Sequence, residues 1–155
     1  MEKLLIIVAS IAGLALIALF LLGYRSHSGE PPGLVEGRLQ PCPDTPNCVS
    51  SEFVSDAAHY IEALVYSADQ EAEVLPRLIK VVRELGGSIQ LEEADYLAAT
   101  FTSPVFRFVD DLELRIDREQ KTIHLRSASR VGRSDLGANR KRVELLKNAF
   151  RSKAG

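Results

Sequence analysis

The sequence predicts an α+β fold: an N-terminal transmembrane helix ahead of a two-layer domain, whose antiparallel sheet is covered by helices on one face. Three observations predict this. The chain begins with a long apolar run, continues with a polar stretch rich in turn formers, and then shows the patterns strand, helix, strands, helix. We therefore expect a transmembrane anchor at residues 1–25, a linker at 26–40 and one soluble domain at 41–155.

The apolar run from Leu4 to Leu22 contains no charged residue and no proline. At about 1.5 Å per residue, a helix of this length spans roughly 28 Å, close to the thickness of a bilayer core. A cleaved signal peptide has a shorter apolar centre and a small-residue cleavage site, whereas this run ends at Gly23, Tyr24 and Arg25. We expect an uncleaved, single-pass anchor with Tyr24 at the depth of the headgroups.

Two cysteines, Cys42 and Cys48, enclose the short loop PDTPN just after the linker. The charges around the apolar run do not decide its orientation, but a disulfide between these cysteines would persist in an oxidising compartment. We therefore expect the inner (cytoplasmic) membrane, with the domain facing the periplasm. Redox or metal chemistry at the two thiols stays open as an alternative. Two thiols are too few for a closed zinc site, so we expect no metal and no cofactor.

The domain's elements follow from its apolar periodicity. Residues 60–66 alternate as in a strand, and residues 69–85 have helical spacing up to Gly86 and Gly87, with Pro76 either opening that helix or kinking it. Further strands are expected at 88–92, 96–103, 106–117 and 122–130, and a closing helix at 139–151. The linker, with its Pro31–Gly33 turn, is expected to be a tether.

Strand alternation also orients the polar residues. In 106–117 the even positions are apolar except Asp110, which therefore faces the core side. On the next strand Ser127 and Ser129 share the inward face, and Arg126 and Arg130 point outward. Two registers keep the apolar faces together. One pairs Asp110 with Ser129 and Glu113 with Arg126, and the other pairs Asp111 with Arg130.

The segment from Arg126 to Arg140, RSASRVGRSDLGANR, is too polar for a core and rich in arginine, serine and glycine. Arginine binds carboxylates and phosphates in fixed geometry, so this composition favours a shaped polar site. A loop held in shape by its own side chains is the competing interpretation. The candidate binding residues are Asp110, Asp111, Arg126, Ser127, Ser129, Arg130, Asp135, Asn139 and Arg140.

Three motifs occur in order: CPDTPNCVSS, FRFVDDLEL and RSASRVGRSDLGANRKRVE. Together they resemble the bacterial and plastid family known as domain of unknown function 1499, over about residues 42–146. The resemblance implies a short, exported or membrane-tethered domain and brings no activity with it.

Two functions are compatible with these features. The first is a non-enzymatic binding or envelope-assembly module, which uses the Arg/Ser/Asp-rich segment to bind an envelope protein or an anionic lipid. The alternative is a hydrolase of an anionic envelope compound, with Asp110 or Asp111 as acid or base and the arginines as an anion clamp. Nucleic acid is excluded as a partner, because the chain has 19 Lys and Arg against 21 Asp and Glu and its basic part offers no stacking aromatics.

Overall fold

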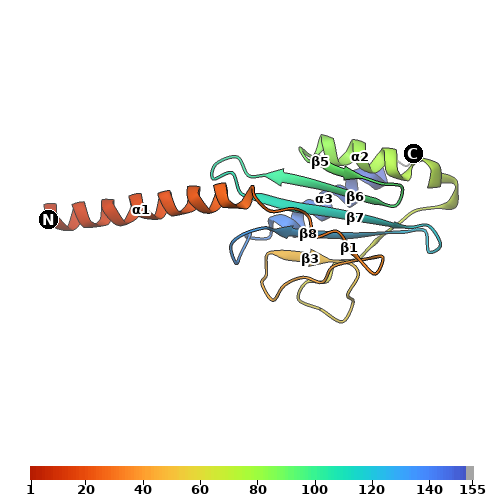
Figure 1. Ribbon diagram of the computed structural model, residues 1–155, viewed down its shortest axis with the longest axis horizontal. Helices are drawn as coiled ribbons and strands as arrows, with labels where there is room; N and C mark the ends of the chain where they lie inside the picture. The colour runs from red at the N-terminus through yellow and green to blue at the C-terminus, as the bar shows by residue number, and fades with distance from the viewer. Residues whose placement is uncertain (153–155) are drawn as a thin grey trace.

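The computed structural model describes residues 1–152, in which a long helix leads into an α+β domain (Figure 1). The helices are α1 (Glu2–Ser26), α2 (Val74–Glu84) and α3 (Ala138–Ser152), with a 3-10 helix, η1 (Ala68–Glu73). The strands are β1 (Leu34–Val35), β2 (Arg38–Leu39), β3 (Cys48–Ser50), β4 (Leu64–Val65), β5 (Ser88–Glu92), β6 (Tyr96–Thr102), β7 (Val109–Asp117) and β8 (Thr122–Ser129).

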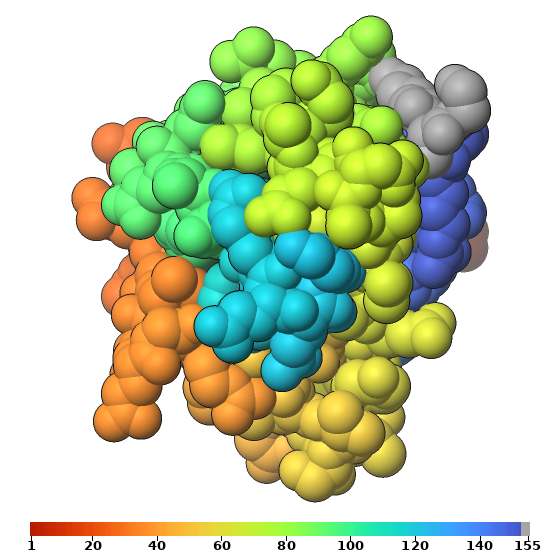
Figure 2. All heavy atoms as spheres, turned by 90° about the vertical axis from the view of Figure 1, so that its right-hand side faces the viewer, coloured from red at the N-terminus to blue at the C-terminus, as the bar shows by residue number. Residues whose placement is uncertain are grey.

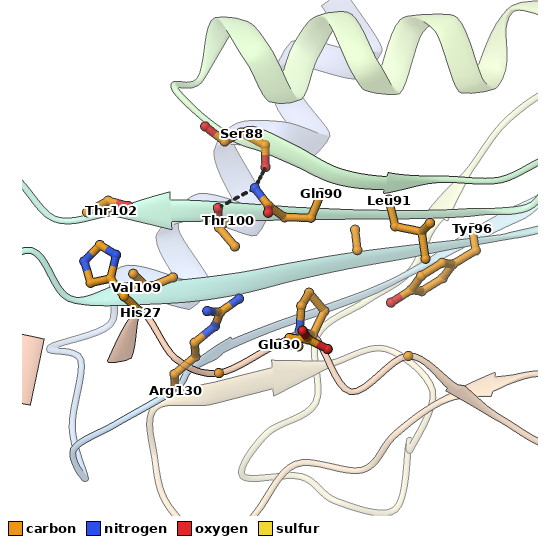
Figure 3. Close-up of a pocket in the computed structure, with 14 residues that line it drawn as sticks. His27, Glu30, Ser88, Gln90, Leu91, Tyr96, Thr100, Thr102, Val109 and Arg130 are labelled. Atoms are coloured by element: carbon orange, nitrogen blue, oxygen red, sulfur yellow. Dashed lines mark hydrogen bonds between the residues drawn. The ribbon is translucent and has the colours of Figure 1, made fainter. Parts of the chain in front are cut away.

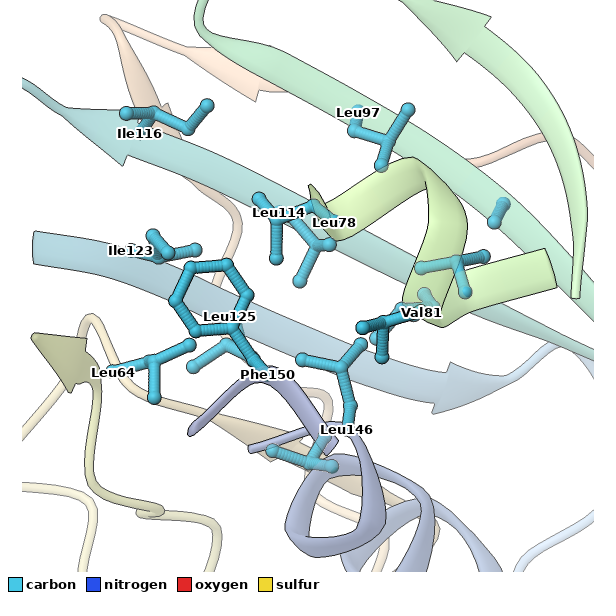
Figure 4. Packing of buried hydrophobic residues seen from close by; sticks show 14 of the residues in the cluster. Leu64, Leu78, Val81, Leu97, Leu114, Ile116, Ile123, Leu125, Leu146 and Phe150 are labelled. Carbon is cyan, nitrogen blue, oxygen red and sulfur yellow. The ribbon is translucent and has the colours of Figure 1, made fainter. Parts of the chain in front are cut away.

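The main sheet is antiparallel and has the order β3-β8-β7-β6-β5, with β4 also paired to β8. Helices α2 and α3 pack on one face of it, and apolar side chains from both layers meet there (Figure 4). Leu78 of α2 and Leu146 and Phe150 of α3 are almost fully buried, as are Leu114 and Leu125 of the sheet. The predicted α+β architecture, with helices on one face, is confirmed.

Three predicted elements differ in extent. The strand predicted at 106–117 begins only at Val109, because Phe106 lies in the turn before it and packs on Phe20 of α1. Of residues 60–66, only β4 is a strand, because Ile61 and Leu64 are both buried although they lie three residues apart, which breaks the alternation of a strand. The helix predicted at 69–85 begins as η1 and becomes α-helical at Val74. Pro76 lies in the first turn of α2, where a proline has no intrahelical hydrogen bond to lose.

The segment expected to be a tether, 26–40, instead lies across the sheet face that α2 and α3 leave open, here called the outward face. Residues 34–39 form the β1–β2 hairpin, and Leu39 is buried against Tyr96 and Ala98. The backbone N–H of Gly33 donates to Oε1 of Glu113 at 3.0 Å. Two-residue strands carry no periodic signal, so the polar composition alone pointed to a linker.

Helix α1 is long and apolar enough to cross a membrane, a property that anchors and signal sequences share, and no residue of its most apolar window is buried. Its last turn docks on the β6–β7 turn, where Gly23 packs against the carbonyl of Phe106. At the opposite end of the domain the β7–β8 turn lies against η1, and Lys121 pairs with Glu71 (Figure 2). The domain therefore has one end beside the apolar helix and one end remote from it.

Candidate functional site

The register between β7 and β8 pairs Asp110 with Ser129 and Glu113 with Arg126, which is the first of the two predicted registers. This register sends the side chains of the Arg/Ser/Asp-rich segment to two different faces of the sheet. Those facing α3 and those facing outward form separate networks.

On the face toward α3, Asn139 connects the sheet to the helix. Its amide nitrogen donates to the carbonyl oxygen of Asn47 and to Oγ of Ser129, each at 3.0 Å. Its side-chain oxygen accepts from Oγ of Ser127 at 2.6 Å and from the guanidinium of Arg142. Asn139 is 1% exposed, so these bonds replace the water that its amide would otherwise bind.

Arg142 also binds the one charged residue in the apolar register of β7. Its Nη2 lies 2.6 Å from Oδ2 of Asp110, and its guanidinium lies over the ring of Phe101. Asp110 thus receives a charge partner from α3, and not from the preceding loop at 132–137. That loop is ordered by Asp135, whose carboxylate accepts from the backbone N–H groups of Gly137 and Asn139 at the start of α3.

On the outward face, the fully buried Glu113 accepts hydrogen bonds from three groups. These are Nη1 of Arg126 at 2.9 Å, the hydroxyl of Tyr96 at 2.8 Å and the N–H of Gly33. Burial raises the pKa of Glu113 above its usual range, because lost hydration outweighs the bonds from Tyr96 and Arg126. Burial, with the adjacent carboxylate, also raises the pKa of Tyr96, so its hydroxyl remains a donor.

Asp111 and Arg130 form a second outward pair, with Nη2 of Arg130 2.7 Å from Oδ1 of Asp111 and Nε 3.0 Å from both carboxylate oxygens. Nη1 of the same arginine donates to the carbonyl oxygen of Ser26 at 3.3 Å. An arginine at a helix C-terminus satisfies a carbonyl that has no intrahelical partner. Arg130 thereby connects the sheet to the end of α1.

The nine candidate residues therefore bind one another, the backbone, or the neighbouring side chains of Arg142 and Glu113. Even Arg140, at the surface, donates to the carbonyl oxygens of Tyr60 and Ala58. Their role in binding a partner stays a prediction, since these contacts do not test it. The disulfide between Cys42 and Cys48 is formed, and it holds the loop before β3. Within residues 1–152, no group of three or more His, Cys, Asp or Glu is placed to hold a metal ion.

A groove of about 690 Å³ lies beside these networks, between the outward face and the crossing segment 27–33 (Figure 3). Its floor is made by outward side chains of β5 and β6, including Gln90 and Thr100, which are hydrogen-bonded to each other at 3.1 Å. Tyr96 lies toward one end of the groove, and His27 and Arg130 lie toward the end at α1. The groove offers hydroxyl and amide groups, with little free charge.

Among the nine candidates, only Arg130 lines this groove. The other lining residues were not predicted from the sequence, although one signal was available. On β6 the outward positions are Tyr96, Ala98, Thr100 and Thr102. Alternate small and hydroxyl-bearing residues leave a shallow floor that large side chains would fill. The roof at 27–33 gave no signal, because its position depends on the hydrogen bond from Gly33 to Glu113.

A family model described as protein of unknown function (DUF1499) matches residues 38–150. The chain belongs to the DUF1499 family. No curated protein matches the sequence. The DUF1499 match runs from Arg38 in β2 to Phe150 in α3, so it includes the main sheet and both helices that cover it. Helix α1 and the groove's roof at 27–33 precede the matched residues.

Proposed function

We propose that this DUF1499 protein is a non-enzymatic, membrane-anchored binding module of the periplasm, and that the groove on the outward face is its binding site. One observation carries the proposal: the groove is open and polar, while the arginine that lines it, Arg130, is already bound to Asp111. Preformed concave sites with a few polar groups are the usual form of small-molecule sites.

The pairing of the carboxylates favours binding over hydrolysis. Asp110 and Asp111, which the hydrolase alternative requires as acid or base, are held by Arg142 and Arg130. Carboxylate oxygens that are held by a guanidinium are not free to reach a proton of a substrate, as a general acid or base must. The paired arginines are likewise less available as an anion clamp, so an uncharged polar compound fits the groove better.

The contacts of α1 support an anchor that is retained. Ser26 is 1% exposed, and its hydroxyl accepts the backbone N–H of Val109 at 3.0 Å. Removal of α1 by a signal peptidase would leave this N–H and the guanidinium of Arg130 without those partners, at a cost in stability. The disulfide supports a domain outside the cytosol.

A fusion experiment tests the compartment. Alkaline phosphatase fused after the C-terminus is active outside the cytosol, whereas green fluorescent protein exported there through the same anchor stays dark. We expect an active phosphatase fusion of the size of the uncleaved chain. A fluorescent fusion with inactive phosphatase would place the domain in the cytosol.

Filling the groove tests the binding role. Thr100→Trp places an indole on the groove floor, and Val65→Trp places one on an exposed residue of β4 at the remote end as a matched control. Each full chain is extracted from its membrane into nanodiscs, and retained small compounds are identified by native mass spectrometry. We expect a compound retained by the wild type and by Val65→Trp but lost from Thr100→Trp. The same retained set in all three proteins would contradict the proposal.

A further inference from the structure

A second hollow, of about 430 Å³, lies between α1 and the β6–β7 turn. It is lined by Phe20, Tyr24, His27, Phe106 and Arg107, so its walls are largely aromatic. The rings of Phe20 and Phe106 lie edge to face with their centroids 5.2 Å apart. This hollow opens along the side of the apolar helix.

The position of Phe20 places this hollow relative to a bilayer. If Tyr24 marks headgroup depth, Phe20 lies about 6 Å deeper, at roughly 1.5 Å per residue. Phe106 packs on Phe20, so the β6–β7 turn reaches the same depth. Val105 in that turn is 63% exposed, as expected for a side chain covered by lipid and not by protein. The turn therefore lies beside the acyl chains.

The two hollows are neighbours, because His27 lines both, and Nε2 of His27 lies 2.9 Å from the carbonyl oxygen of Arg107. A molecule that occupies both would have a polar end on the floor of β5 and β6 and an apolar end beside Phe20 and Phe106. The polar groove offers mostly neutral hydroxyl and amide groups, and the guanidinium of Arg130 is already bound to Asp111. The carboxylate of Glu30 on the roof disfavours an anionic occupant.

We infer that the ligand is a bilayer lipid with an uncharged, hydroxyl-rich head, such as a glycosyl diacylglycerol. The head lies in the groove, and an acyl chain follows α1 past Phe20. This inference rests on the proposed function and names the ligand of the same site. Because the acyl chain is already in lipid, its contacts with Phe20 and Phe106 replace contacts with other acyl chains. Hydrogen bonds to the head therefore supply the preference for this lipid.

The depth of the turn is measured first. The chain contains no tryptophan, so a single introduced one reports its own surroundings. The full chain carrying Val105→Trp, or Val65→Trp as the control, is reconstituted in phosphatidylcholine vesicles with brominated acyl chains. We expect bromine to quench the indole of the Val105→Trp variant strongly and that of the Val65→Trp variant little. Equal, weak quenching of both would place the turn outside the bilayer and overturn the inference.

Crosslinking then identifies the head. A benzophenone side chain replaces Leu91, which lines the groove and is 47% exposed, or replaces Val65 as the control. Nanodiscs of phosphatidylcholine contain a small fraction of glucosyl diacylglycerol or of phosphatidylglycerol. We expect glucosyl lipid to crosslink at position 91 at least about tenfold more than phosphatidylglycerol, a difference of ~1.4 kcal/mol. Thr100→Trp should abolish this crosslink, and position 65 should show no preference.

The outcomes separate this inference from the proposed function. Equal crosslinking of glucosyl lipid, phosphatidylglycerol and phosphatidylcholine, or a preference for phosphatidylglycerol, overturns the uncharged head. Free glucose that competes as well as excess glucosyl lipid overturns the lipid source but leaves a polar binding groove. Absence of any specific crosslink overturns the inference. The proposed function is contradicted as well only if native mass spectrometry also finds the same retained compounds in Thr100→Trp as in the wild type.

Discussion

At the scale of single residues, Asn139 illustrates how the Arg/Ser/Asp-rich segment is used. One buried amide joins β8, the loop before β3 and α3 through its bonds to Ser129, Asn47 and Ser127. A buried polar network is stable only when each member has its partners. The polar composition that first indicated a binding site thus has a second use, which is to fix α3 on the sheet.

Truncation of the Asn139 side chain is expected to destabilise the fold. Asn139→Ala should lower the free energy of unfolding by about 3 kcal/mol, because buried serine and carbonyl groups lose their partners. Asn148→Ala, at an exposed position of the same helix, is the matched control and should change stability by less than about 0.5 kcal/mol. Urea unfolding of the full chain in nanodiscs measures both. Similar values for the two variants would show that the network does not hold α3.

Glu113 gives the protein a pH dependence that differs from that of an ordinary carboxylate. Its pKa is raised from the usual value of 4.5, so its folded environment favours the protonated form. Its contribution to stability is present below that value and is lost as the pH rises through the raised pKa. Relative to Glu113→Gln, the wild type should therefore lose stability as the pH rises above about 4.5.

Glu52 supplies a control, because its contribution to stability changes with pH in the opposite direction. Burial alone would raise its pKa, but the hydrogen bonds from Arg115 and Arg38 outweigh burial and lower it. The contribution of Glu52 is present above the usual value and is lost as the pH falls. Unfolding free energies of the wild type, Glu113→Gln and Glu52→Gln, measured across roughly pH 3 to 8, where carboxylates titrate, should show the two opposite slopes. If the wild type changed in stability with pH in the same direction relative to both variants, the environments assigned to Glu113 and Glu52 would be wrong.

At the scale of elements, the short strand β3 depends on the loop before it. The disulfide closes that loop between Cys42 and Cys48, and Cys48 is itself paired with Ala128 of β8. Constraint of a loop this short removes about 2 kcal/mol of chain entropy from the unfolded state. The disulfide therefore constrains the loop that leads into this three-residue edge strand.

Replacement of both cysteines tests this contribution. Cys42→Ala with Cys48→Ala should lower the free energy of unfolding by about 2 kcal/mol. A reducing agent should destabilise the wild type by a similar amount and leave the double variant unchanged, which provides the internal control. A wild type insensitive to reductant would show that the loop is held by its other bonds, such as that of Asn47 to Gly132.

The elements also show what the sequence could predict. The alternation in β7 and β8 correctly indicated which face each side chain takes, because a period of two is fixed by the strand itself. The groove was not predictable in the same way. Its floor lies on β5 and β6, its roof is the segment 27–33, and the contact of Gly33 with Glu113 joins positions 80 residues apart without a local signal.

At the scale of the whole molecule, the orientation of the domain relative to α1 depends on a close contact at Gly23. A Cβ atom at Gly23 would lie 1.8 Å from the carbonyl oxygen of Phe106, so only glycine allows α1 to approach the β6–β7 turn so closely. Ser26, one turn of helix further on, is bonded to Val109. Helix and domain are thus joined as a rigid unit and not through a flexible tether.

A leucine at this contact should separate the two parts without changing the apolar character of the helix. Gly23→Leu must displace the turn. In a Val105→Trp background, we therefore expect brominated lipid to quench the introduced indole less. We also expect the groove to lose its preference for glucosyl lipid. Gly13→Leu is the matched control, since no atom lies within 4 Å of a Cβ at that position. It adds the same side chain to the same helix and should leave both signals unchanged. If Gly23→Leu also left both unchanged, the domain would be held at the membrane by contacts other than this one.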